Sequence, residues 1–207
     1  MRRRLVPCLC ICGLLFAGQV TAASAAESAA GYVAGRSSDT TVRFDLIVPT
    51  VECTGPANSF LAIGTIFGEG TRISWSVAAK LTADCTTRGS RYRLSIGVLT
   101  QGLTLRTRAG RRLHITLHQG ADGEEAIVEQ GTRRFEVSDT SIAVPSLVQL
   151  SVLRARGDAP FSPLRLRRIT VNGKPFSSIA PSAFQGSGMR VSALTASGEG
   201  FTVKLAN

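Results

Sequence analysis

The chain has 207 residues, of which 43% are hydrophobic and only 6% aromatic, and its formal net charge is +10. This length suffices for one domain with a sizeable core, and the chain contains no internal repeat. Aromatic residues do not alternate with the arginines as they would on a stacking surface for bases, so no specific nucleic-acid partner is expected.

The first 25 residues are typical of a secretory signal peptide. Arginines at 2–4 are followed by an apolar run over 5–18, which is short for a membrane span, and by an A-x-A cleavage site ending at Ala25. Cleavage there would release a secreted chain without a transmembrane segment. The small polar residues 26–40 predict a flexible tether, and residues 41–207 predict a single domain.

The processed chain would keep a basic character and one pair of cysteines. Removal of the three signal arginines from 24 basic residues leaves 21 against 14 acidic ones, a net charge of +7. Such a charge suits an anionic wall polymer as a partner, but a solubilising surface is the preferred interpretation. Cys53 and Cys85 are the cysteines that remain, and in an oxidising compartment they are expected to pair.

Residues 41–48 alternate strictly between apolar and polar side chains, which predicts a strand with one buried face that ends at Pro49. Similar alternation between Gly, Pro and Ser turns predicts further strands at 59–67, 71–85, 91–99, 111–118, 125–130, 132–137, 146–154, 164–171, 189–195 and 200–205.

Turn signals lie at Gly131 and at Asn172-Gly173, and a brief helical turn is expected within 177–184. No segment keeps a helical period for three turns. The pattern therefore predicts an all-β fold, an antiparallel β-sandwich of the jelly-roll or concanavalin-like kind.

The two histidines of the chain, His114 and His118, share the outer face of one predicted strand. Four residues along a strand span about 13–14 Å, which is too far for both to bind one metal ion. No cysteine or acidic residue near them in the sequence completes a ligand set. The sequence therefore predicts solvated histidines and no metal.

Carboxylates gather in one part of the chain, at Glu124, Glu125, Glu129, Glu136 and Asp139. Paired carboxylates would suit acid–base hydrolysis, and Glu125 and Glu129 share strand parity. Solvated side chains of a hairpin are the other interpretation. No nucleophile elbow, phosphate loop or H-E-x-x-H motif occurs.

Three segments read F-D-L-I-V-P-T-V-E-C-T from Phe44, P-A-N-S-F-L-A-I-G from Pro56, and I-T-V-N-G-K-P-F from Ile169. Together they resemble the eqolisins, a family of glutamic peptidases, and their bacterial relatives. The resemblance runs loosely from about Val42 to the C-terminus, and the V-P-T-V-x-C element is its most specific part.

This resemblance implies a sandwich of two large antiparallel sheets, one of them curved to form an open cleft. Members of the family are secreted, acid-acting endopeptidases. A Glu acts as general base on water, and a Gln binds that water and stabilises the oxyanion, without a metal or other cofactor.

The resemblance places Trp75 at the position of the family's Gln and Gln149 at the position of its Glu. An indole cannot orient water as a carboxamide does, and a carboxamide cannot act as a general base. No Asp or Glu occurs over 141–154, so a shift of register within that strand does not restore the base. Glu136 and Glu129 are the fallback carboxylates.

The favoured hypothesis is a secreted, eqolisin-like and non-catalytic module that binds a peptide or glycan in a cleft lined by Trp75, Tyr92 and Gln149. Trp75 is equally well explained as a core aromatic. One alternative is a divergent acid-acting endopeptidase that uses Glu136 or Glu129. The other is a basic protein that binds an anionic wall polymer through two arginine stripes, formed by Arg106, Arg108, Arg111 and Arg112, and by Arg165, Arg167 and Arg168.

Overall fold

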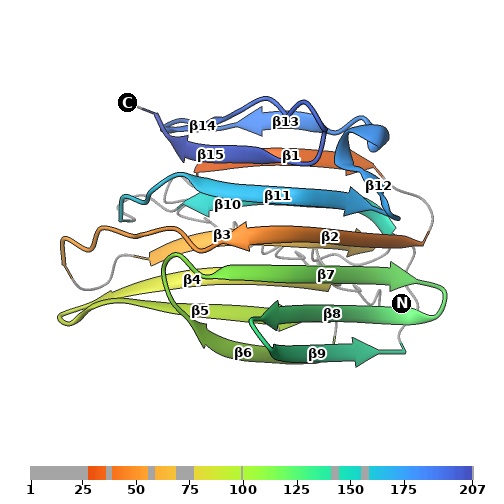
Figure 1. The fold of residues 1–207 in the computed structure, drawn as a ribbon, viewed down its shortest axis with the longest axis horizontal. Coiled ribbons are helices and arrows are strands. Elements are labelled where there is room, and N and C mark those ends of the chain that lie inside the picture. The colour runs from red at the N-terminus through yellow and green to blue at the C-terminus, as the bar shows by residue number, and fades with distance from the viewer. Residues whose placement is uncertain are drawn as a thin grey trace, which may run out of the picture.

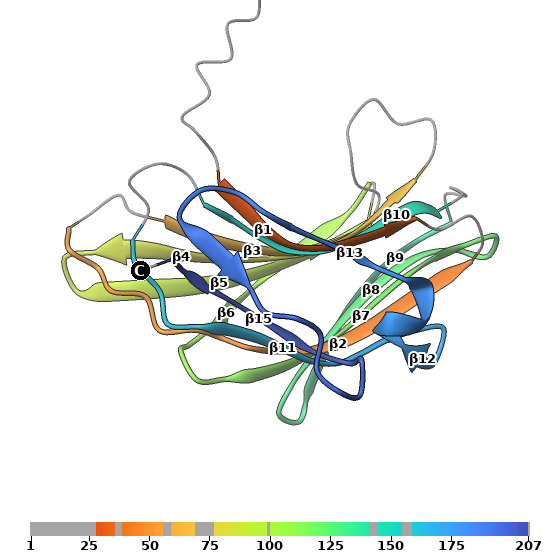
Figure 2. The same cartoon turned by 90° about the horizontal axis from the view of Figure 1, so that it is seen from above.

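The computed structural model describes residues 28–35, 39–55, 59–68, 77–98, 100–140, 145–154 and 159–206. Within these ranges the chain forms two antiparallel sheets that pack face to face (Figures 1 and 2). The predicted all-β sandwich is therefore confirmed. In the part of the chain that the structure describes, no helix is long and apolar enough to cross a membrane.

One sheet has seven strands, in the spatial order β13 (Ser182–Gln185), β1 (Ser28–Gly35), β10 (Pro145–Arg154), β3 (Ser59–Gly68), β4 (Val77–Thr86), β5 (Gly89–Gly97) and β6 (Gly102–Thr107). The other has eight, in the order β14 (Met189–Val191), β15 (Phe201–Leu205), β11 (Leu164–Val171), β2 (Thr40–Ile47), β7 (Arg112–Gly120), β8 (Gly123–Gln130) and β9 (Arg133–Asp139), with β12 (Lys174–Pro175) paired to β11. A short 3-10 helix, Phe176–Ile179, precedes β13.

The core lies between the sheets and is built by the alternation seen in the sequence. Val148, Leu150 and Val152 of β10 are fully buried, and so are Leu113 and Leu117 of β7 in the other sheet. Full burial of such a side chain contributes about 1.5–3 kcal/mol. The polar side chains between them point outward, so each sheet has one outer face that is available for function.

The turn signals are also confirmed. Gly131 has a φ of 65° between β8 and β9, and Asn172 and Gly173 have φ values of 51° and 74° between β11 and β12. Positive φ at both central positions is the geometry of the tight hairpin turn that Asn-Gly favours. These turns fix the register of the strands on either side of them.

The expectation of a tether over 26–40 is wrong for its central part, because Ser28–Gly35 forms β1 between β13 and β10. Ala30 and Tyr32 point into the core, where the Tyr32 ring packs against Phe201 with 4.8 Å between ring centroids. Gly31 leaves no room for a side chain, since a Cβ there would lie 2.2 Å from the Leu150 carbonyl oxygen. At Gly31, the small size that suggested a tether is thus required for close strand packing. Strand β6 was likewise missed by the sequence pattern.

Cys53 and Cys85 form the predicted disulfide, with 5.4 Å between their Cα atoms. It joins the segment that follows β2 to the end of β4, so it connects the two sheets. The bridge links positions 32 residues apart in the sequence.

Replacing both Cys53 and Cys85 by Ala is expected to lower the free energy of unfolding by about 3–4 kcal/mol, because the unfolded chain regains the entropy of an open loop. Urea unfolding followed by circular dichroism measures this loss. Reduction of the unchanged protein should shift the urea midpoint in the same direction. Equal midpoints for the parent and the double variant would contradict the prediction.

Candidate functional site

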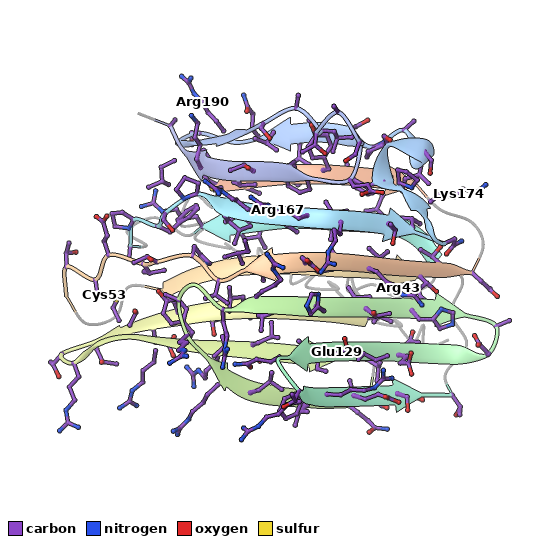
Figure 3. All side chains as sticks on the ribbon, in the orientation of Figure 1. Arg43, Cys53, Glu129, Arg167, Lys174 and Arg190 are labelled. Carbon is purple, nitrogen blue, oxygen red and sulfur yellow. A yellow bond between two sulfur atoms is a disulfide. The ribbon has the colours of Figure 1, made fainter. Side chains whose placement is uncertain are left out.

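The outer face of the eight-stranded sheet carries charged side chains from strands that are far apart in the sequence. The pairing register places them in one lateral row across five strands, formed by Arg167, Asp45, His114, Glu129 and Arg134. Figure 3 labels Arg167 and Glu129 on this sheet. Opposite charges on neighbouring strands stabilise such a row.

Asp45 is the second member of this row and is only 6% exposed, although it lies on an outer face. Its Oδ2 accepts a hydrogen bond from Arg168 Nε at 2.7 Å and forms an ion pair with Arg168 Nη2 at 2.5 Å, and its Oδ1 lies 2.6 Å from His114 Nδ1. Arg168 and His114 therefore cover the carboxylate from water. A buried charge is tolerated when it is paired and hydrogen-bonded in this way.

Arg168 reaches Asp45 because β11 contains a bulge. The register between β11 and β2 shifts between Arg167 and Thr170, which inserts one extra residue, and Arg168 adopts a φ of 50°. A left-handed conformation costs a residue with a side chain about 1–2 kcal/mol. Bulges re-aim side chains, and strained residues concentrate at functional sites. This strained arginine therefore marks the Asp45 cluster as a candidate site.

The two histidines share this outer face, as predicted, but they are not simply solvated. His118 Nδ1 lies 2.9 Å from Thr41 Oγ1, and its Nε2 lies 2.8 Å from Asp122 Oδ1. The hydrogen bond with His118 holds the pKa of Asp122 below its ordinary value. The partner of His118, Asp122, follows it by four residues, whereas the partner of His114, Asp45, comes from a neighbouring strand 69 residues away in the sequence. Among the described residues, no group of three or more His, Cys, Asp or Glu could hold a metal ion.

Three carboxylates complete the face. Glu129 and Glu136 are contacted by Arg134, at 3.7 Å and 2.8 Å. Burial raises the pKa of Glu125 above its ordinary value, and the neighbouring Glu136 raises it further. The sequence interpretation of solvated hairpin carboxylates therefore describes Glu129 and Glu136 better than Glu125.

A shallow groove of about 750 Å³ runs over these side chains. It is lined by Arg43, Asp45, His114, Thr116, His118, Asp122, Glu125, Ile127, Glu129, Arg134 and Arg168, together with Thr41, Phe44, Ile115 and Thr170. Positive and negative side chains alternate along it, and hydroxyls lie between them. Such a surface offers hydrogen-bond donors and acceptors within one extended site.

The predicted site residues of the opposite sheet lie elsewhere. Gln149 is on the outer face of the seven-stranded sheet, between the buried Val148 and Leu150, and its Nε2 donates a hydrogen bond to Ser151 Oγ at 2.8 Å. Glu129 and Glu136 are on the outer face of the other sheet, and the two sheets lie about 10 Å apart. Gln149 and either carboxylate therefore cannot meet across one cleft. Trp75 lies outside the described residues.

Tyr92 borders a different cavity but contributes little surface to it. Only 6% of the residue is exposed, and its hydroxyl accepts a hydrogen bond from the Val51 backbone N–H at 2.9 Å. Its ring belongs to the core, and its hydroxyl is already occupied.

Sequence reasoning missed Asp45 and Arg168 as members of a site. The alternation over 41–48 places Asp45 outward, and Arg168 belongs to a predicted arginine stripe, but no local signal connects the two residues. Their contact depends on β2 and β11 being neighbours.

The sequence matches no family model and no curated protein. Among solved structures, the chain is similar to scytalido-glutamic peptidase bound to a peptide-based transition-state analogue. The TM-score is 0.62 and the identity 13%, over 87% of this chain and 99% of that one. A second structure of that peptidase, with a transition-state analogue inhibitor, gives the same values. The chain has the fold of a glutamic peptidase. At this identity the likeness concerns the fold alone.

Replacing Glu125 by Gln is expected to alter how stability depends on pH. Because the pKa of Glu125 is raised in the folded state, the folded chain binds more protons between the ordinary pKa and the raised one, so stability falls as pH rises through that window. Glu125→Gln removes this contribution, and its stability relative to the parent should increase with pH. Urea unfolding between pH 4 and pH 8 measures the difference.

The exposed Glu52 provides the matched control, since Glu52→Gln removes the same charge away from the groove. Parallel pH profiles for the parent and Glu125→Gln would contradict the prediction.

Proposed function

We propose that the chain is a secreted, non-catalytic binding module, and that it binds a peptide or glycan in the groove of the eight-stranded sheet. The observation that carries the proposal is the Asp45–His114–Arg168 cluster, which is assembled from three strands and held by a strained residue.

The cluster fixes hydrogen-bonding groups in place before a ligand arrives. Asp45 holds Arg168 through two N–H groups, while the Arg168 side chain stays 62% exposed, so other guanidinium N–H groups face solvent. The His114 side chain is 41% exposed beside it. Fixed donors lose little conformational freedom on binding, which raises affinity for a complementary ligand.

The charge balance of the groove favours a polar ligand without a large net charge. Its lining includes three arginines, Arg43, Arg134 and Arg168, against four carboxylates, Asp45, Asp122, Glu125 and Glu129. The two signs interleave, so the groove has no strong field of one sign. Backbone amides of a peptide or hydroxyls of a glycan can pair with both kinds of group.

Two further observations support secretion and the lack of catalysis. The Cys53–Cys85 disulfide is typical of proteins of oxidising compartments. Gln149, which the resemblance places at the position of the family's Glu, lies on the opposite outer face from the groove carboxylates, so among the described residues none of those carboxylates can replace that Glu.

Binding should depend on Arg168. Arg168→Gln keeps the strand but removes the donors that face the groove, and we expect about a tenfold or greater loss of affinity, the effect of one charge-assisted hydrogen bond. The probes are an array of wall oligosaccharides and the tryptic peptides of casein. When the ligand is added to the ¹⁵N-labelled protein, the NMR chemical shifts of backbone amides in β2, β7 and β8 should change.

Arg167→Gln is the matched control, because Arg167 is exposed and adjacent but does not line the groove. Equal losses for both variants, or amide shifts confined to β10 and β4, would overturn the placement of the ligand.

A second candidate function is an acid-acting endopeptidase, favoured by one observation. Burial, and after it the neighbouring Glu136, raises the pKa of Glu125, as is found for carboxyl groups that act as acids. Such a pair can act as acid and base at low pH.

Purified protein incubated with denatured casein between pH 2 and pH 5 separates the two candidates. The binding proposal predicts no cleavage over this range. Cleavage that disappears in Glu136→Gln, and persists in the control Glu52→Gln, would replace the binding proposal by the peptidase.

A further inference from the structure

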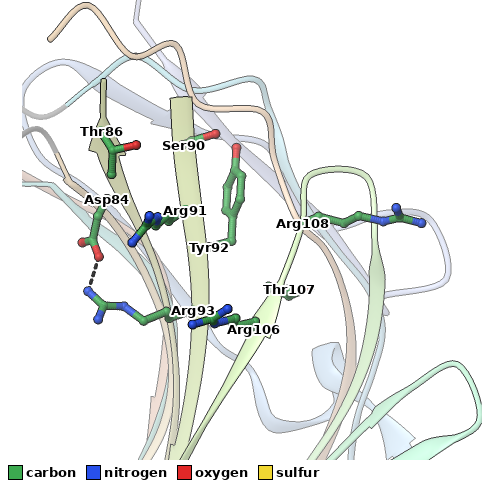
Figure 4. A pocket seen from close by; sticks show the side chains of 9 residues that line it. All are labelled: Asp84, Thr86, Ser90, Arg91, Tyr92, Arg93, Arg106, Thr107 and Arg108. Carbon is green, nitrogen blue, oxygen red and sulfur yellow. Dashed lines mark hydrogen bonds and ion pairs between the residues drawn. The ribbon is translucent and has the colours of Figure 1, made fainter. Parts of the chain in front are cut away.

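A separate cleft of about 540 Å³ lies at the edge of the seven-stranded sheet, on β4, β5 and β6 (Figure 4). Its lining includes Arg91, Arg93, Arg106 and Arg108 but a single carboxylate, Asp84. In contrast to the groove on the other sheet, this cleft is therefore strongly positive.

The arginines of the cleft are held close together by strand pairing. Arg93 of β5 lies directly opposite Arg106 of β6, and Arg91 lies opposite Asp84 of β4. In Figure 4 the guanidinium groups of Arg91, Arg93 and Arg106 gather on one side, while Arg108 points away from them. Like charges directly opposite one another destabilise a sheet.

The compensation for this repulsion is incomplete. Asp84 forms an ion pair with Arg93. Among the described residues, no carboxylate forms an ion pair with Arg91 or Arg106. An anion bound at Arg106 and Arg91 would offset the positive charge that the strand register concentrates around Arg106.

A second cavity continues the positive surface toward the other sheet. It has a volume of about 670 Å³, shares Arg106 with the cleft, and adds Arg111 and Arg133, with no carboxylate in its lining. Arg106 thus lies between two positive cavities. We call Arg91, Arg93, Arg106, Arg111 and Arg133 the arginine track.

We propose that the arginine track binds a linear anionic glycopolymer, a wall polymer that carries carboxylate or phosphate groups at intervals. Guanidinium groups pair with both anions through forked hydrogen bonds, and a series of arginines suits a polymer with repeated charges. Nucleic acid fits less well, because Tyr92 keeps its ring in the core and leaves no stacking surface in the cleft. This site is independent of the groove and of the function proposed there.

The test compares two double variants that remove the same charge. Arg91→Gln/Arg106→Gln alters the track, and Lys174→Gln/Arg190→Gln alters exposed residues on β12 and β14, away from β6 and β9 (Figure 3). The probes are polygalacturonate, which carries carboxylates, poly(glycerol phosphate), which carries phosphates, and neutral dextran. Calorimetric titration at several salt concentrations measures the affinities.

We expect the track variant to bind its preferred polymer at least about tenfold more weakly, while the control changes less than about twofold. Added salt should weaken binding of the parent more than binding of the track variant. The preferred polymer identifies the anion, and dextran should not bind. Arg91→Lys/Arg106→Lys should recover part of the affinity, because the charge remains and only the fork is lost.

Equal losses in the track variant and the control would overturn the proposal in favour of net charge alone. Tighter binding of single-stranded DNA or of anionic phospholipid vesicles than of both glycopolymers would also overturn it. Because Arg106→Gln removes the Arg93–Arg106 repulsion, the track variant should be at least as stable as the parent in urea unfolding. A loss of polymer binding in this variant would then not be due to misfolding. Arg168→Gln should leave glycopolymer binding unchanged, which separates this site from the groove.

Discussion

The pairing of β2 with β7 on one side and β11 on the other is the constraint on which the candidate groove depends. Neighbouring strands lie about 4.8 Å apart, so the register places Asp45 within reach of His114 and of the bulge that carries Arg168. The inward side chains of β2, such as Phe44, hold this register by filling the core. A shift by one residue would turn Asp45 into the core and expose Phe44, which the burial of apolar surface strongly opposes.

The sandwich separates charge between two surfaces. On the outer face of the eight-stranded sheet, carboxylates and arginines interleave and neutralise one another, which suits recognition by hydrogen bonds. At the edge formed by β5 and β6, Arg93 lies opposite Arg106, and the lining of that cleft includes a single carboxylate. The first arrangement is stable without a ligand, whereas in the second a bound anion would reduce the repulsion between the arginines. The two surfaces therefore favour different partners, and one chain can hold both.

The fold of this chain and the side chains that would carry out a reaction depend on different features of the sequence. The architecture is that of a glutamic peptidase at 13% identity, because many sequences that alternate with period two and turn at Gly, Asn and Pro can fill the same sandwich. Catalysis demands particular side chains at particular distances. Here Gln149 and the clustered carboxylates lie on opposite outer faces, so among the described residues the likeness extends to the scaffold alone.

The sequence by itself determined most of the strands, the hairpin turns at Gly131 and Asn172 and the Cys53–Cys85 bridge, because alternation, turn conformation and cysteine number are local or compositional properties. It misjudged Ser28–Gly35, since small residues suit both a tether and a closely packed strand. Only the tertiary structure decided which strands are neighbours. That order brings together Asp45 and Arg168, which are 123 residues apart, and no local pattern encodes a contact over such a separation.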